Sequence, residues 1–159
     1  MERMLAVVFD SADKARTAIR ALERLQDESA IALHGAAIVT RHADRVSTIV
    51  DFDRSLPEGT MGGTAIGTLI GMLGGPVGLA LGAATGFIVG ATTDFARNRI
   101  DRGFADAVAN ALAPGKTAVV AEIDEESTDT VDASMRDLGG DVHRRALSDV
   151  VDERMNQAR

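Results

Sequence analysis

Hydrophobic and polar positions follow strand-like and helix-like patterns on both sides of an uncharged central segment. In the first part of the chain, an unbroken apolar run at residues 4–9 predicts a buried strand. Apolar residues then recur at helical spacing up to about Gln26, behind Asp10 or Ser11 as the N-cap, and this pattern predicts an amphipathic helix. Two more strands are expected after this helix, at residues 36–40 and 45–52.

The last part of the chain repeats the arrangement of strand, helix and strand. Its helices are expected at residues 98–112 and 128–138, and its strands at residues 117–123 and 142–147. Two such units therefore flank the central segment. The simplest arrangement that closes them is an α+β fold, in which helices cover one face of a small ferredoxin-like sheet.

The central segment is the most unusual part of the sequence. No charged residue occurs between Glu58 and Asp94, and most of the 16 glycines of the chain lie there. A spacing of four residues places glycines on one helix face, where two backbones can approach closely, so these glycines are predicted to be helix-packing positions in an oligomer. They form two series, Gly63, Gly67, Gly71 and Gly75, and then Gly78, Gly82, Gly86 and Gly90.

The central segment is expected to form a hairpin of two short helices, because Gly74, Gly75 and Pro76 interrupt it. We call residues 61–73 the first arm and residues 77–93 the second arm. The predicted organisation is the first half of an α+β domain at residues 1–58, an inserted glycine-zipper hairpin at 59–94, the second half of the domain at 95–147, and a polar tail at 148–159.

The surroundings of this hairpin are open to three interpretations. Its apolar residues, among them Leu69 and Leu73, need lipid, other copies of the chain or the chain's own body around them. Lipid and other copies are favoured, because the flanking parts have little core to spare. Each arm reaches only about 20 to 25 Å, short of the roughly 30 Å hydrocarbon core, so a full membrane crossing is marginal. Candidates for contact with lipid headgroups are Arg54, Arg97, Arg99 and Arg102.

Composition and charge exclude several classes of function. The formal net charge is −7, there is no basic stripe, and the only aromatic residues are five Phe, so nucleic-acid binding is not expected. The chain contains no Cys, which excludes thiol chemistry. The apolar run near the N-terminus is too short for a secretory signal. We therefore expect a cytoplasmic assembly or a protein on the cytoplasmic side of the inner membrane.

No residue pattern predicts catalysis, a cofactor or a metal. The glycine-rich segment lacks the Lys of a phosphate-binding loop, and the three His are dispersed at positions 34, 42 and 143. A group of five carboxylates is better explained by the start of a helix, where acidic side chains favour the helix dipole, than by a calcium site. These are Glu122, Asp124, Glu125, Glu126 and Asp129.

Several segments of the chain resemble a known bacterial family. They are LAVVFD at residues 5–10, the glycine-rich hairpin, LAPGKTAVVAE at residues 112–122 and LGGDVHRRAL at residues 138–147. Over nearly the whole chain, the sequence is similar to the family catalogued as domain of unknown function 1269. Members are generally labelled membrane proteins, with relatives among general-stress proteins. The resemblance implies a widespread non-enzymatic module, and no catalytic residues come with it.

The sequence therefore predicts a non-enzymatic protein that associates with a membrane, with copies of itself, or with both, through its glycine-zipper hairpins. The alternative is a soluble cytoplasmic domain that binds a small ligand or a regulator on its sheet face, with the hairpin as a dimer clasp.

Overall fold

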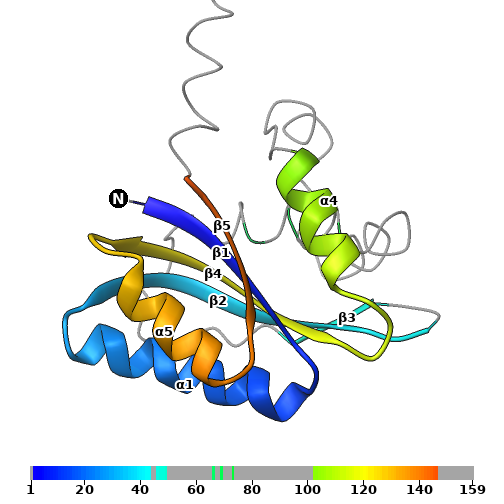
Figure 1. Cartoon of the computed structure of the whole chain (residues 1–159), viewed down its shortest axis with the longest axis horizontal. Helices are drawn as coiled ribbons and strands as arrows, with labels where there is room; N and C mark the ends of the chain where they lie inside the picture. Colours follow the sequence, from blue (N-terminus) through cyan, green and yellow to red (C-terminus); the bar gives the residue numbers. More distant parts are fainter. Residues whose placement is uncertain are drawn as a thin grey trace, which may run out of the picture.

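The computed structural model of the chain describes residues 2–43, 46–49 and 102–146, together with Ile66, Leu69 and Leu73. These residues form an α+β fold in which three helices pack on an antiparallel sheet (Figure 1). The elements in chain order are β1 (Glu2–Phe9), α1 (Ala12–Asp27), β2 (Ile31–Arg41), β3 (Val46–Ile49), α4 (Arg102–Ala111), β4 (Thr117–Glu125), α5 (Asp129–Asp137) and β5 (Asp141–Ala146).

The strand order brings the two ends of the chain together in one sheet. The order is β3-β2-β4-β1-β5, and every neighbouring pair is antiparallel. The connection from β1 through α1 to β2 leaves a gap that β4 fills, and the connection from β4 through α5 to β5 leaves a gap that β1 fills. Each strand-helix-strand unit is therefore completed by a strand from the other unit.

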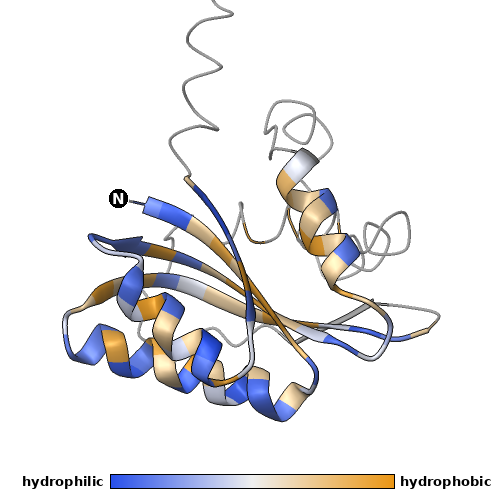
Figure 2. Ribbon diagram, in the orientation of Figure 1, coloured by the Kyte–Doolittle hydropathy of each residue, from blue (hydrophilic) through white to orange (hydrophobic). Residues whose placement is uncertain are grey.

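Both faces of the sheet are covered. Successive side chains of a strand point to opposite faces, so Leu5 and Val7 lie on one face of β1 while Ala6 and Val8 lie on the other. We call the face that packs on α1 and α5 the first face, and the face that packs on α4 the second face. Figure 1 shows α4 on the opposite side of the sheet from α1 and α5, and Figure 2 shows hydrophobic residues along the central strands.

The expectation that helices cover only one face is wrong, and the physical reason is visible in the central strands. β1 is buried without interruption from Met4 to Phe9, and β4 from Thr117 to Ile123. A strand with one solvated face alternates apolar and polar residues, whereas an unbroken apolar run needs cover on both sides.

The two helices of the first face begin and end as the sequence predicts. Ser11 caps α1 by accepting a hydrogen bond from the backbone N–H of Lys14 (3.3 Å). The Ser127 hydroxyl accepts one from the backbone N–H of Asp129 (3.3 Å), at the start of α5. After α5 the chain turns at Gly139, whose φ of 78° favours glycine.

One strand is longer than expected. β2 begins at Ile31, five residues before the predicted start, and its register with β4 shifts between Leu33 and Gly35. This irregularity breaks the alternation on which the prediction depends. Residues 50–52 and 98–101, Leu147, the tail at 148–159 and most of the predicted hairpin lie outside the described residues.

Candidate functional site on the second face of the sheet

Three residues of the glycine-rich segment lie in the core of the second face. Ile66, Leu69 and Leu73 are helical and buried, and Leu69 is completely inaccessible to solvent. Their spacing of three and four residues gives one apolar stripe on a helix. They pack in one cluster with residues of the sheet and of α4, which are Met4, Ala6, Val8, Ala37, Val39, Phe104, Ala105, Val108, Leu112, Ala118 and Val120.

Two contacts with β2 position this stripe at its two ends. A Cβ atom added to Gly35 would lie 3.2 Å from Cδ1 of Ile66, so the Ile66 side chain approaches the backbone of β2 closely there. At the other end, Nη2 of Arg41 donates a hydrogen bond to the carbonyl oxygen of Leu73 (3.2 Å). Leu73 is the last residue of the predicted first arm, and a cation is favourable at the C-terminal end of a helix. We call Gly35, Ala37, Val39 and Arg41 the arm seat.

Arg41 is itself held in place by the loop before β4. Its backbone N–H donates to the carbonyl oxygen of Lys116 (3.1 Å), and its carbonyl oxygen accepts from the N–H of Gly115 (2.7 Å). Gly115 has a φ of 88°, which the turn after Pro114 requires. The guanidinium that reaches Leu73 therefore extends from a fixed backbone.

The residues predicted to carry function are not brought together by the described structure. All eight glycines of the two series, and Arg54, Arg97 and Arg99, lie outside the described residues. Arg102 is the first residue of α4, but its side chain is also outside them. Helix packing through the glycines and headgroup contact through the arginines thus stay predictions.

The surroundings expected for Leu69 and Leu73 are corrected by the structure. The sequence favoured lipid or another chain around them, on the ground that the flanking parts have little core to spare. Instead, both residues are buried against the chain's own sheet. The second face provides this apolar surface because β1 and β4 are apolar on both sides.

The second face also buries a carboxyl group. Glu122 on β4 is 8% exposed, and its Oε2 atom has no hydrogen-bond partner in the part of the chain that the structure describes. Burial, and a hydrogen bond and charge repulsion with Glu2, raise the pKa of Glu122 from 4.5 to about 7. A buried carboxyl without a cationic partner favours its neutral form.

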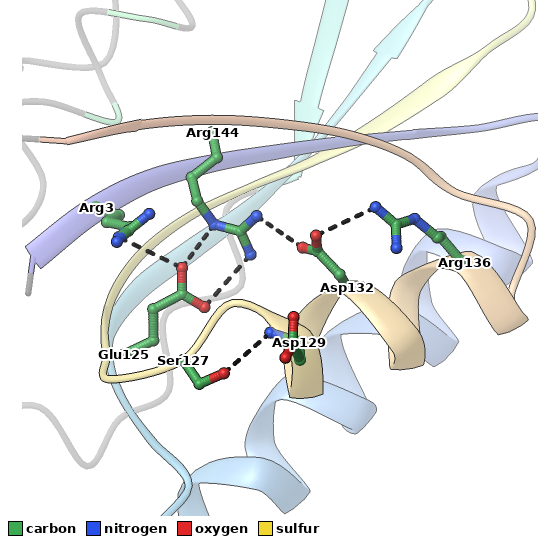
Figure 3. Close-up of polar contacts among 7 residues, drawn as sticks. All are labelled: Arg3, Glu125, Ser127, Asp129, Asp132, Arg136 and Arg144. Carbon is green, nitrogen blue, oxygen red and sulfur yellow. Dashed lines mark hydrogen bonds and ion pairs between the residues drawn. The ribbon is translucent and has the colours of Figure 1, made fainter.

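On the first face, by contrast, Glu125 has cationic partners. Figure 3 shows its fully buried side chain between Arg3 and Arg144. The Nε atom of Arg144 lies 2.6 Å from Oε1 of Glu125, and the Nε atom of Arg3 lies 3.7 Å from it. Nη1 of Arg144 also lies 2.7 Å from Oδ1 of Asp132, so this arginine links β4, β5 and α5.

The acidic run does not converge on a cation site. Glu122 and Glu125 lie on opposite faces of β4, and Asp129 is in the first turn of α5. No group of three or more His, Asp or Glu side chains that could hold a metal ion occurs among the described residues. Likewise, no helix in the described ranges is long and apolar enough to span a membrane.

A known family model covers the glycine-rich segment and the part of the chain that follows it. The family model DUF1269, described as a protein of unknown function, matches residues 60–158, more than half of the chain. The chain belongs to the DUF1269 family. The match includes the glycine-rich segment, α4, β4, α5 and β5, but not the LAVVFD motif of β1. No curated protein and no solved structure has significant similarity to this DUF1269 protein.

The extent of the match has a structural consequence for this DUF1269 protein. Of the sheet, the matched residues contain only β4 and β5, and β1 lies between these two strands. The matched region therefore needs a strand from the preceding part of the chain to complete its sheet.

Proposed function

We propose that this DUF1269 protein is a non-enzymatic association module, which assembles with copies of itself through its glycine-rich hairpin. The observation that carries the proposal is the burial of Ile66, Leu69 and Leu73 on the second face. The body holds the first arm by its apolar stripe. The glycine series is then available for close packing against a further helix, either the second arm or a hairpin of another copy.

Helix geometry supports this division of the first arm into two surfaces. Each residue advances about 100° around a helix axis. On a helix that continues through the first arm, Gly63, Gly67 and Gly71 centre about 130° away from the stripe of Ile66, Leu69 and Leu73. The residues that contact the sheet and the glycines are thus different sets, and one helix can use both at the same time.

We further propose that the body is a ferredoxin-like fold into which the hairpin is inserted. Its support is the interleaving of the two strand-helix-strand units, with β2-β4-β1-β5 as consecutive strands and α1 and α5 on the same face. The hairpin, the edge strand β3 and α4 occupy the connection between β2 and β4.

We do not propose that the sheet face binds a small ligand, because both faces are covered. α1 and α5 pack on the first face, and α4, Ile66, Leu69 and Leu73 pack on the second. Membrane association stays a prediction, which depends on the apolar residues of the second arm and on the arginines that flank the hairpin.

The proposal is tested by particle mass in detergent-free buffer. Light scattering of the wild type is expected to give a multiple of the 16.7 kDa chain mass. Gly71→Leu and Gly82→Leu place bulk on the two glycine faces, so the mass should fall while circular dichroism stays unchanged. Ala107→Leu, which places the same side chain at an exposed position of α4, is the control and should leave the mass unchanged.

Two results would count against self-association. A wild-type particle with the mass of one chain would contradict it directly, as would an unchanged mass in both glycine variants. Recovery of the protein only with detergent, or its sedimentation with anionic lipid vesicles, would favour the membrane instead.

A further inference from the structure

β5 is an edge strand of the sheet. It is the last strand of the order β3-β2-β4-β1-β5, and among the described residues it pairs only with β1 (Figure 1). The strand is six residues long, from Asp141 to Ala146. On its outer side an edge strand presents backbone N–H and C=O groups that the sheet does not use, and these groups can pair with a strand of another chain.

The side chains of β5 alternate between the two faces of the sheet. Val142 packs on the core of the first face, and Arg144 forms its ion pairs on that face. Asp141, His143 and Arg145 therefore lie on the second face. Asp141 and Arg145 are exposed residues, and Oδ2 of Asp141 lies 3.0 Å from Nε2 of His143.

The charges on this side of β5 are self-complementary. Asp141 and Arg145 have opposite charges, and they lie two residues before and two residues after His143. When a second copy of β5 runs antiparallel with His143 opposite itself, Asp141 of each copy lies opposite Arg145 of the other. Opposite charges at directly opposed positions stabilise a pair of strands. One two-fold axis thus produces two complementary charge pairs.

Other alignments of two β5 strands are less favourable. A two-fold axis that relates antiparallel neighbours is perpendicular to the sheet, so it opposes residues of the same face. With Arg144 at the axis, like charges meet, because this arginine lies opposite its own copy. With Val142 at the axis, only residues 141–143 of the two strands are paired. The alignment about His143 pairs residues 141–145, and it opposes no like charges when His143 is neutral.

We propose that β5 is an assembly surface, at which two copies of the chain pair their β5 strands antiparallel about His143. The two sheets then continue into each other through both copies. This surface is separate from the glycine-rich hairpin, so the inference does not rest on the proposed function. A chain that uses both surfaces forms assemblies larger than a dimer.

Disulfide cross-linking tests this pairing, since the chain has no Cys of its own. Directly opposed Cβ atoms of antiparallel strands are about 4.5 to 5.5 Å apart, so His143→Cys brings two thiols within reach of a disulfide after a small adjustment. A mild oxidant should cross-link this variant at least about tenfold faster than Thr17→Cys, which places a thiol at an exposed position of α1. Ala146→Cys, at about 20 Å from its own copy in this alignment, should also cross-link slowly. Denaturing electrophoresis without reductant measures the rates.

Charge reversal tests the alignment of the two strands. In the His143→Cys chain, Asp141→Arg alone or Arg145→Asp alone places like charges opposite each other and should slow the cross-link about tenfold. The double exchange restores opposite charges and should restore the rate. Circular dichroism checks that each variant stays folded, and the comparison of His143→Cys with Thr17→Cys decides even where a reversal variant does not fold.

Equal rates in His143→Cys and Thr17→Cys would overturn the pairing of β5, and the charges at this edge would then serve only to keep other strands away. A double exchange that is as slow as the single ones would overturn it as well, because it would show that the charges do not align the strands.

Failure of this pairing is distinguishable from failure of the proposed function. Gly71→Leu and Gly82→Leu should leave the cross-link of His143→Cys in place, because the hairpin is a separate surface. A cross-link that forms while the particle mass is insensitive to these glycine variants would reject the hairpin alone. Absence of the cross-link, with a mass that the glycine variants still lower, would reject the pairing of β5 alone.

Discussion

The two faces of the sheet are covered in different ways, and their two buried glutamates show the difference. On the first face, α1 and α5 pack on the strands, and Glu125 is neutralised by Arg3 and Arg144. On the second face, α4 packs on the same strands together with Ile66, Leu69 and Leu73, and Glu122 forms no ion pair with any described residue. Only two residues, Ile123 and Asp124, separate the two glutamates on β4.

This contrast indicates which face of the sheet is more costly to expose to water. The Glu125 carboxylate is costly to separate from Arg144, which also pairs with Asp132 of α5. When a buried carboxyl without a cationic partner ionises, the cost of keeping its charge away from water favours exposure of the group. We therefore expect the first face to be the more costly of the two to expose to water.

The largest effect is expected when β1, which contributes to both faces, is removed. A fragment of residues 60–159 keeps the family-matched region but leaves β4 and β5 without the strand between them. We expect no cooperative thermal unfolding of this fragment and little strand signal by circular dichroism. A fragment that unfolds cooperatively, as the full chain does, would show that the two faces do not depend on β1.

Truncating one buried leucine on each face of the sheet compares how much the packing of each face stabilises the protein. Leu69→Ala on the second face and Leu22→Ala on the first each remove a fully buried side chain. Each should lower the free energy of unfolding by about 2 to 4 kcal/mol, because each leaves a cavity. Urea unfolding measures both values. If Leu69→Ala has no effect while Leu22→Ala has its full effect, the first arm does not pack on the sheet in solution.

Removing the charge of Glu125 tests how much its ion pairs stabilise the first face. Glu125→Gln leaves Arg144 with Asp132 as its remaining partner and should cost about 2 to 3 kcal/mol at pH 7. Asp13→Asn, which removes an exposed ion pair with Arg16 on α1, is the control and should have no measurable effect in the same urea titration. Equal stability of the wild type and Glu125→Gln would contradict a structural role of this network.

Two glycines probe how closely each face is packed. A Cβ at Gly140 would lie 2.5 Å from Cγ1 of Val7 and 2.9 Å from the carbonyl oxygen of Met135, so Gly140→Ala should cost about 1 to 3 kcal/mol. Gly35→Ala meets only the flexible end of Ile66 at 3.2 Å and should cost less than about 1 kcal/mol. Thermal unfolding ranks the two variants, and the opposite order would contradict the assignment of the tighter contact to the first face.

The smallest expected effect is an increase in the free energy of unfolding, whereas the preceding variants lower it. The raised pKa of Glu122 means that the wild type loses stability as the pH rises from about 4.5 through about 7. Glu122→Gln should therefore be more stable than the wild type by about 1 to 2 kcal/mol at pH 8, and should have no such advantage at pH 4. Urea titrations at the two pH values measure the difference. Destabilisation by Glu122→Gln at pH 8 would mean that the carboxylate has a stabilising partner.

The periodicity of apolar residues predicts the elements of the first face well, because each helix carries its own pattern and its own cap. Ser11 and the apolar stripe of α1 are local features of this kind. The start of β2 is missed because the irregularity beside Gly35 interrupts the alternation. Such an irregularity depends on the pairing with β4, which is far away in the sequence.

The arm seat could not be predicted for a similar reason. The sequence shows that Leu69 and Leu73 need apolar surroundings, but it does not show which surface provides them. That surface consists of strands from both ends of the chain, and it exists only once the sheet has formed. The unlike roles of Glu122 and Glu125 also depend on the sheet, because the alternation of β4 and the register of β5 place Arg144 beside only one of them.

The most direct test of the account is the nuclear Overhauser effect between the δ1 methyl group of Ile66 and the α protons of Gly35. Measured at pH 5 on full-length protein, it should be strong, because the methyl carbon lies close to the glycine backbone. In a mixture of labelled and unlabelled chains it should arise within one chain. The absence of this contact, or its appearance only between different chains, would contradict the packing of the first arm on its own sheet.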